Sequence, residues 1–306
     1  MHEQRPVLVV GSVNMDLVTR AAHIPAAGET IAGTDFATFA GGKGANQAVA
    51  VGRLGYPVQM VGRVGEDAFG LALREGLREM GVNAAAVRVT PGPSGVASIV
   101  VAENGENCIV IVAGANGQLS PEDMDAEAER IAGAGMVLAQ LEVPLPTVER
   151  LAVLCERSGV PLVLDPAPVC ALPESLLRRV TWLTPNETEA AGLVGHGEPE
   201  QVAERLLALG PQGVVLKLGA RGAYLRTQAG YALRVPAFAA TPLDTTAAGD
   251  AFNGAFATAL LLGRELGAAA RFAAAAAAIS VTRAGAQSSM ASMAEVESML
   301  ANEERV

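Results

Sequence analysis

Short apolar runs with strand character alternate with helix-like segments along most of this 306-residue chain. Val7–Val10 and Val58–Val61 are β-rich, whereas Asn46–Leu54 and Asp67–Met80 space their apolar residues as helices do and end before a glycine. Such alternation is typical of an α/β fold, in which helices cover both faces of a central, mostly parallel sheet. Further buried strands are predicted at Met136–Leu141, Leu162–Leu164, Trp182–Leu183 and Val214–Leu218.

Two segments interrupt this alternation. Val96–Val101 and Cys108–Val112 are β-rich runs on either side of Asn104-Gly105, and Asn-Gly between such runs indicates a β-hairpin. Residues 13–40 contain several turn-forming residues and show no helical period. We expect these two inserted segments, about 13–40 and 95–113, to form a small β-sheet lid on a single domain that spans residues 1–306.

Composition and charge exclude several classes of protein. Half of the residues are hydrophobic and only 18% are charged, so the chain can bury a large core. No apolar stretch is long enough to span a bilayer, and the first residues lack the features of a signal peptide, which predicts a cytoplasmic protein without a membrane partner. The net charge of −10 argues against nucleic-acid binding, because that binding relies on Lys and Arg.

Cysteine and histidine usage excludes some kinds of site. Cys108, Cys155 and Cys170 are odd in number and form no CxxC pair, so we expect three buried, reduced thiols. The three histidines are scattered, which argues against a histidine metal centre or a catalytic triad. In so acidic a chain, any phosphate site must be built locally from backbone amides, a helix N-terminus or a metal.

The segment Asp244–Asp250, with the sequence DTTAAGD, directly precedes the predicted helix Ala251–Leu262. Its small residues allow close approach of a ligand to backbone amides at the start of a helix, where negative charge is favoured. Asp250 lies in the same turn and could accept a hydroxyl proton during phosphoryl transfer. The alternative is that Asp250 only caps the helix.

A glycine-rich turn, Gly41–Asn46 with the sequence GGKGAN, opens the helix that runs to Leu54. Glycines permit positive φ and close approach to a ligand. The turn is not a P-loop, because Gly44 follows the lysine, and it is not a GxGxxG dinucleotide turn, which argues against a dehydrogenase. By itself the turn is compatible with either a structural role or a binding role.

Polar residues follow several of the predicted strands, where ligands of open α/β sheets bind. Asn14 and Asp16 lie two apart after the first strand and could grip neighbouring hydroxyls, or could form an Asx-turn. Glu142 and Glu189 follow later strands, where an acid can bind a sugar or hold hydrated Mg²⁺. The turn Leu218–Gly222 could support a nucleotide or only join two strands.

Taken together, these motifs resemble those of the ribokinase-like carbohydrate kinases, also called the phosphofructokinase-B family. The resemblance extends from about residue 7 to about residue 290, and its most specific elements occur in the family's order. It implies a central sheet with helices on both sides, a β lid that forms a homodimer, and transfer of the γ-phosphoryl group of ATP to the 5-hydroxyl of D-ribose. The matching elements are Asn14-x-Asp16, Gly41–Asn46, Pro185-Asn186-x-x-Glu189 and Asp244–Asp250; Gly41–Ala50, Ala113–Asn116 and Arg271–Gln287 resemble the ribose-specific members.

The resemblance also implies a role for individual residues. Asp250 matches the general base, and the amides of Ala247, Ala248 and Gly249 match an anion hole. The positions that match ribose contacts are Asn14, Asp16, Gly42, Lys43, Gly44, Ala45, Asn46, Glu142 and Asp250. The positions that match nucleotide contacts are Asn186, Lys217, Leu218, Gly219, Ala220, Arg221, Gly222, Gly249, Asp250 and Ala274. Glu189 matches the acid that organises Mg²⁺ through water, and the match to a K⁺ loop comprises Asp244, Thr246, Ser280, Arg283, Gly285 and Ser289.

The chain departs from the family pattern at two positions. Ala247 stands where the family often has glycine, and Ala274 stands where a histidine is sometimes found near adenine. One alternative function is a kinase of the same family that acts on fructose, 2-deoxyribose, a keto-deoxy acid or a nucleoside. Another is a sugar or nucleotide sensor without activity, although the intact Asp250 and its glycine turn argue against it.

Overall fold

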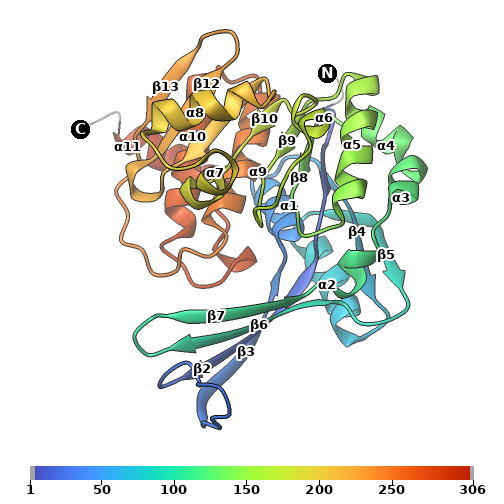
Figure 1. The fold of residues 1–306 in the computed structure, drawn as a ribbon, viewed down its shortest axis with the longest axis vertical. Helices are drawn as coiled ribbons and strands as arrows, with labels where there is room; N and C mark the ends of the chain where they lie inside the picture. The colour runs from blue at the N-terminus through green and yellow to red at the C-terminus, as the bar shows by residue number, and fades with distance from the viewer. Residues whose placement is uncertain (1–3, 304–306) are drawn as a thin grey trace.

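The computed structural model describes residues 4–303, and its main body is built on a nine-stranded sheet (Figure 1). The strand order is β13-β12-β11-β10-β9-β8-β1-β4-β5, and every pairing from β11 to β5 is parallel, whereas β12 and β13 form an antiparallel edge. The predicted α/β fold is therefore confirmed. Residues 1–3, part of the segment considered for a signal peptide, lie outside the described residues. The strands are β1 Val7–Val10, β4 Val58–Gly65, β5 Asn83–Thr90, β8 Met136–Ala139, β9 Leu162–Leu164, β10 Trp182–Leu183, β11 Gly213–Lys217, β12 Ala223–Thr227 and β13 Ala232–Val235.

Helices cover both faces of this sheet, as the alternating side chains of β1 show. Leu8 and Val10 pack in a buried cluster with the helices α3 to α8, while Val7 and Val9 pack in the cluster with α1, α2 and α9. None of the helices within residues 4–303 combines the length and hydrophobicity needed to cross a bilayer. The helices are α1 Lys43–Arg53, α2 Ala68–Glu79, α3 Pro121–Ala126, α4 Ala128–Gly133, α5 Leu145–Ser158, α6 Glu174–Leu177, α7 Glu187–Val194, α8 Pro199–Ala208, α9 Ala248–Leu261, α10 Leu266–Ser280 and α11 Met293–Glu303.

Two helices start earlier than the sequence predicts, and both starts lie in glycine-containing turns. The helix α1 begins at Lys43 rather than Asn46, and α9 begins at Ala248 rather than Ala251. Neither helix has a side chain that caps its first turn, whereas Ser120 caps α3 in a capping box. Without a capping residue the sequence carries no clear mark of the first helical residue, so both predicted starts were late.

A second sheet of four strands, in the order β3-β2-β6-β7, projects from the main body (Figure 1). Its strands are β2 Asn14–Ala21, β3 Gly33–Gly41, β6 Gly95–Ala102 and β7 Asn107–Val112. The predicted hairpin is confirmed, because β6 and β7 pair antiparallel around Gly105, whose φ is 86°. Only three residues separate the end of β1 from the start of β2, so the lid sheet continues directly from the main sheet.

The expectation of three buried thiols is wrong for two of the cysteines. All three are free, but only Cys155 is buried, in the middle of α5. Cys108 is exposed on β7, an edge strand of the lid sheet, and Cys170 is exposed in the loop after β9. Apolar character alone could not reveal that these two positions lie on the surface.

Candidate active site

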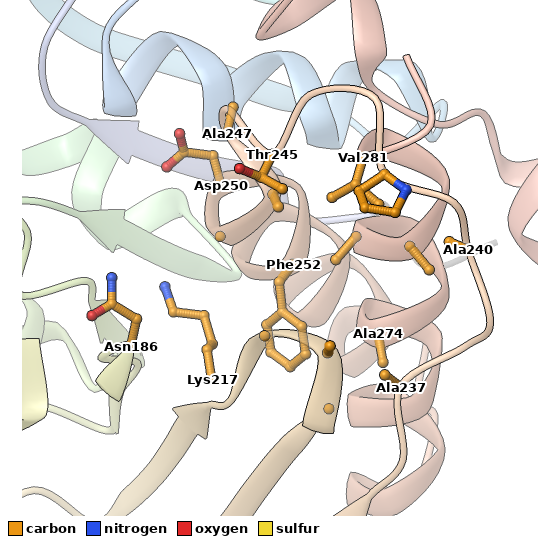
Figure 2. Close-up of a pocket in the computed structure, with 18 of the residues that line it drawn as sticks. Asn186, Lys217, Ala237, Ala240, Thr245, Ala247, Asp250, Phe252, Ala274 and Val281 are labelled. Atoms are coloured by element: carbon orange, nitrogen blue, oxygen red, sulfur yellow. The ribbon is translucent and has the colours of Figure 1, made fainter. Parts of the chain in front are cut away.

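A cavity of about 700 Å³ lies beyond the carboxyl ends of β9, β10 and β11, next to the start of α9. Polar side chains line one end of it and alanines line the other, as the labelled residues in Figure 2 show. The polar side chains are Lys43, Asp165, Asn186, Glu189, Lys217, Thr245 and Asp250. The apolar end includes Ala237, Phe238, Ala239, Ala240, Phe252, Ala274, Ala277, Ala278 and Val281. The cavity thus offers a charged part and a dry part side by side.

The first turn of α9 presents free backbone amides to this cavity. No side chain caps the helix, and the N–H groups of Ala247, Gly249 and Asp250 have no hydrogen-bond acceptor within residues 4–303. The N–H of Ala248 donates to the carbonyl oxygen of Thr245 at 3.3 Å, so this predicted member of the anion hole is already partly engaged. Unpaired amides at the positive end of a helix dipole bind anions.

Ala247, the residue before α9, has a left-handed backbone with φ of 60°. Among the described residues it is the single non-glycine residue with positive φ. This conformation costs an alanine about 1–2 kcal/mol relative to the right-handed region. Backbone strain of this kind concentrates at functional sites, and here it bends the chain into the helix without a cap.

Asp250 lies in the same turn, with only 5% of its surface exposed. Its Oδ2 accepts a hydrogen bond from Nδ2 of Asn46 and its Oδ1 accepts one from Nε2 of Gln47, each at 3.0 Å. Burial raises its pKa to about 6, against the opposing effect of the nearby ammonium of Lys43, and Asp165 adds to the rise. Asp250 is therefore ionised at neutral pH and more basic than an exposed aspartate, as a general base requires.

Lys43 is the central cation of the site. Burial alone would lower the pKa of its amine, but the surrounding carboxylates, led by Asp250 and Asp165, raise it above the ordinary value. The charges of Glu142 and Glu189 raise the pKa in the same direction. The amine is therefore charged, and it partly offsets the repulsion between the carboxylates.

The glycine-rich turn packs directly on the chain between β1 and β2. A methyl group added at Gly42, whose φ is 90°, would lie 2.7 Å from the backbone nitrogen of Asn14. Oε2 of Glu142 joins the two segments by accepting hydrogen bonds from Oγ of Ser12 at 2.6 Å and from N–H of Lys43 at 3.1 Å. Such close approach requires glycine, which explains a motif that was ambiguous in the sequence.

Three predicted sugar contacts are used within the protein. The N–H groups of Gly44 and Ala45 donate to Ser12, the former to Oγ at 3.4 Å and the latter to the carbonyl oxygen at 2.9 Å. Asn46 donates to Asp250 rather than facing open space. In this structure all three therefore organise the site around the glycine-rich turn and Asp250.

Asn14 and Asp16 lie at the start of β2, close to Glu142. Oδ1 of Asn14 accepts a hydrogen bond from the buried Nδ2 of Asn116 at 2.6 Å, which sets the orientation of the Asn14 amide. Burial, together with the charge of Glu142, raises the pKa of Asp16 to about 7. The orienting role of Asn116, which also bonds to Val13, was not predicted from the sequence.

Asn186 and Glu189 line the polar end of the cavity as a capping box at the start of α7. Both oxygens of Glu189 accept hydrogen bonds from Asn186, Oε2 from the backbone at 2.8 Å and Oε1 from Nδ2 at 2.9 Å. Burial, then the charge of Asp165, raises the pKa of Glu189. An acidic, oxygen-rich position of this kind suits a divalent cation such as Mg²⁺.

The turn after β11 reaches the cavity with only part of its length. Gly219, Ala220 and Gly222 line the cavity, as does Lys217 before them. Leu218 is instead buried in the core, and the side chain of Arg221 forms an ion pair with Glu187. Ala274, predicted near the base of a nucleotide, lies in the apolar end.

The predicted cation loop brings two segments together through Asp244. Its carboxylate accepts hydrogen bonds from N–H of Thr246 and N–H of Gly285, each at 2.9 Å, and these bonds outweigh burial and lower its pKa. The carbonyl oxygens of Asp244, Thr246 and Gly285 accept no hydrogen bond from any described residue. Ser280 and Ser289 instead bond to nearby carbonyls, and Arg283 pairs with Glu295. Free carbonyls beside a carboxylate are suitable ligands for a hard cation.

Comparison with known proteins identifies the family. A family model described as pfkB family carbohydrate kinase matches residues 4–293. The chain belongs to this family. It is 44% identical over 298 residues to a ribokinase of Bacillus subtilis, covering 97% of this chain and 99% of that protein. A deoxyribokinase of Salmonella typhimurium is 36% identical over 301 residues, covering 96% and 98% of the two chains.

A solved structure agrees closely with the fold. Arabidopsis thaliana ribokinase in complex with ribose and ATP matches with a TM-score of 0.92 and 37% identity, over 97% of this chain and 99% of that one. Asp165, which lines the polar end of the cavity, and Gln47, which donates a hydrogen bond to it, were not predicted from the sequence. Asp165 directly follows the predicted strand Leu162–Leu164, so the rule that selected Glu142 could have found it. Gln47 lies within a predicted helix and carries no such signal.

Proposed function

We propose that this chain transfers the γ-phosphoryl group of ATP to the 5-hydroxyl of D-ribose, giving ribose 5-phosphate and ADP. The observation that carries the proposal is the buried carboxylate of Asp250 in the same helical turn as the free amides of α9. A phosphoryl transfer needs a proton acceptor and an anion-stabilising group side by side. Membership of the pfkB family and similarity to ribokinases over almost the whole chain support the same activity.

The two substrates approach Asp250 from different directions. Ribose binds between the lid and the glycine-rich turn, where Asn14, Asp16 and Lys43 gather around Glu142. ATP occupies the cavity, with its base among the alanines around Ala274 and its phosphates toward α9. The apolar end excludes water from the base, whereas the polar end provides the charges that the phosphates require.

Proton and phosphoryl transfer then follow in one in-line step. Asp250 accepts the proton of the 5-hydroxyl as that oxygen forms its bond to the γ-phosphorus and the bond to the β-phosphate oxygen breaks. The amides of Ala247, Ala248 and Gly249, with that of Asp250, stabilise the charge on the transferring group. Lys217 assists from beside the helix start, because a methyl group at Gly249 would lie 3.1 Å from its Nζ.

Two cations are part of this proposal. Glu189, held by Asn186 at the polar end, organises Mg²⁺ through water, and that ion would neutralise the phosphates when bound. The carbonyl oxygens of Asp244, Thr246 and Gly285 hold K⁺, which would stabilise the backbone that leads into α9. Ser280, Arg283 and Ser289 contribute through their backbone, since their side chains are engaged elsewhere.

The lid also provides a surface for a homodimer. Asp16, Ala97 and Ile111 are paired across β2, β6 and β7, so they share the face that bears the sugar-binding side chains. Val110 lies on the opposite face and is 59% exposed, and every residue of β7 is exposed. An exposed apolar edge strand is a site for association, and here the partner is a second copy of the lid.

A coupled assay of ADP release tests the proposed function. D-ribose should give the highest kcat/KM in a panel that contains 2-deoxyribose, fructose, a keto-deoxy acid and nucleosides. Asp250→Asn should lower kcat by about 10²-fold or more, because general-base catalysis contributes about 10²–10⁴. Higher kcat/KM on 2-deoxyribose would assign the chain to the deoxyribokinase activity of its Salmonella relative, and no turnover of any sugar would indicate a sensor.

A further inference from the structure

The amide of Gln47 lies between two buried carboxylates, those of Asp250 and Asp165. Its Nε2 donates to Oδ1 of Asp250 at 3.0 Å and to Oδ2 of Asp165 at 3.1 Å. Ionised carboxylates only accept hydrogen bonds, so the chemistry of its neighbours requires Gln47 to present its NH₂ group to both. Its Oε1 must then face the other way, where it accepts a hydrogen bond from Nε2 of Gln140 at 2.7 Å.

The orientation in which Gln140 donates to Gln47 leaves the side-chain oxygen of Gln140 unpaired in the described chain. Its Oε1 is buried and has no hydrogen-bond partner within residues 4–303. A methyl group added at Gly11 would lie 2.0 Å from that oxygen, so only glycine leaves room for it. Buried unpaired oxygens are rare in folded proteins, which indicates that the orientation of Gln47 matters more here than pairing every atom of Gln140.

The chain of contacts continues from Asp165 to the phosphate end of the cavity. Oδ1 of Asp165 accepts a hydrogen bond from Nζ of Lys217 at 3.2 Å, and that ammonium lies beside Gly249 at the start of α9. The hydrogen-bonded side chains of this network are buried, so water does not replace the bonds between them. No more than 5% of the surface is exposed in Gln47, Gln140, Asp165 or Asp250. One amide therefore connects the proton acceptor to the cation at the phosphoryl site.

We propose that Gln47 is a positioning residue for phosphoryl transfer: its amide, oriented by Gln140, fixes Asp250 relative to Asp165 and Lys217. This inference rests on the proposed role of Asp250 as the base. Gln47 is buried and both of its amide atoms are hydrogen-bonded within the protein, so its effect falls on the transfer step rather than on binding. A misplacement of about 1 Å in such a group costs about 10²-fold in rate.

The matched pair of variants is Gln47→Leu and Asn253→Leu. Gln47→Leu keeps a similar volume but cannot donate, so kcat should fall about 10- to 100-fold, while KM for ribose and ATP changes less than about threefold. Asn253 is fully buried one turn further along α9, and neither of its amide atoms has a partner within residues 4–303. Asn253→Leu therefore controls for the exchange of a buried amide and should keep wild-type kcat.

The pH profile of kcat provides a readout that a general loss of packing would not change. Asp250 is surrounded by Lys43 on α1, by Asp165 after β9 and by the amides of Asn46 and Gln47. Loss of the Gln47 donor removes a bond to the ionised form, so the acid limb of kcat should move to higher pH in Gln47→Leu. Gln140→Leu should move it in the same direction by less, and this variant provides the test if Gln47→Leu does not fold.

A double-mutant cycle decides between positioning and a separate structural role. If Gln47 acts through Asp250, then Gln47→Leu should lower kcat less than about twofold in the Asp250→Asn background. A full additional loss in that background, or an unchanged kcat and acid limb in the single variant, would overturn the inference. Wild-type turnover by Asp250→Asn alone would instead overturn the role of Asp250 in the proposed function.

Discussion

Asp250→Asn should make the protein more stable at the same time as it removes activity. The reason is the burial of the carboxylate, which raises its pKa from 3.8 to about 6. A carboxylate with a raised pKa binds its proton more tightly in the folded chain than in the unfolded chain. The folded state is therefore disfavoured as the pH rises through this range, and an uncharged amide removes that disadvantage.

The structure sets the size of the effect. One step in pKa corresponds to about 1.4 kcal/mol, so the rise from 3.8 to about 6 corresponds to about 3 kcal/mol of stability lost above pH 6. At pH 5 most of the Asp250 side chains of the folded chain carry a proton, and the loss is only about half as large. Near pH 4 the difference between the variant and the wild type should become small, because the carboxyl group is protonated in much of the unfolded chain as well.

Hydrogen bonding at the site does not cancel this gain. The side-chain amide introduced by Asp250→Asn would keep one oxygen to accept from Gln47 or Asn46, but its NH₂ group would face the other donor. Oδ1 of Asn46 is buried without a partner within residues 4–303, so the Asn46 amide can turn over and accept from the new NH₂ group. The exchange therefore leaves no additional buried donor or acceptor unpaired.

Urea denaturation at pH 8 and pH 5 measures the effect directly. The free energy of unfolding of Asp250→Asn should exceed that of the wild type by about 3 kcal/mol at pH 8 and by about half of this at pH 5. Asp35→Asn, which removes an exposed carboxylate from β3, should change it by less than about 0.5 kcal/mol. An equal or lower stability of Asp250→Asn at pH 8, or a gain independent of pH, would refute the reasoning.

Three further outcomes follow from other parts of the site. Because the pKa of Asp16 is about 7, KM for ribose should rise about tenfold between pH 8 and pH 6 as the carboxylate gains a proton, and Asp16→Asn should abolish this dependence in initial-rate assays. K⁺ should raise kcat in a buffer of bulky organic cations. Thr246→Val should retain this activation because the variant keeps the backbone carbonyl. Gly285→Pro should lose the activation because it removes the N–H that donates to Asp244. Val110→Glu should convert a lid-mediated dimer to a monomer in analytical ultracentrifugation, and a wild type that already sediments as a monomer would contradict the proposed lid contact.

Much of the fold could be predicted because each strand and helix carries its own local pattern. Val7–Val10 and Leu162–Leu164 match β1 and β9 to the residue, and Asn104-Gly105 correctly placed the lid hairpin. The predictions were weaker where a long-range contact decides the conformation. Strand β5 was missed because its residues 83–90, NAAAVRVT, are rich in alanine and gain their strand pairing from β4.

The candidate site shows the same division between local and long-range information. Asp250 and the glycine-rich turn could be found because they depend on spacing within a few residues of the chain. The hydrogen bond from Gln47 to Asp250 joins residues 203 positions apart, and the one from Gln140 to Gln47 joins residues 93 apart. An amide side chain inside a helix has no local mark of function, so its role appears only when α1, β8 and α9 come together.

Several unfavourable features of the molecule meet around the first turn of α9. Ala247 has a strained backbone, the helix lacks a cap, and Asp250 is an ionised group in a buried position. Two nearby oxygens, Oδ1 of Asn46 and Oε1 of Gln140, are buried without partners in the described chain. Each feature lowers the stability of the free protein, and local strain of this kind persists only where the surrounding structure holds it in place.

An anionic ligand at the free amides would relieve the uncapped helix, and a proton received by Asp250 would relieve the buried charge. Transfer of the hydroxyl proton to Asp250, with negative charge developing on the phosphoryl group beside the free amides, would therefore move this site toward its more stable state, which is what differential stabilisation of a transition state requires.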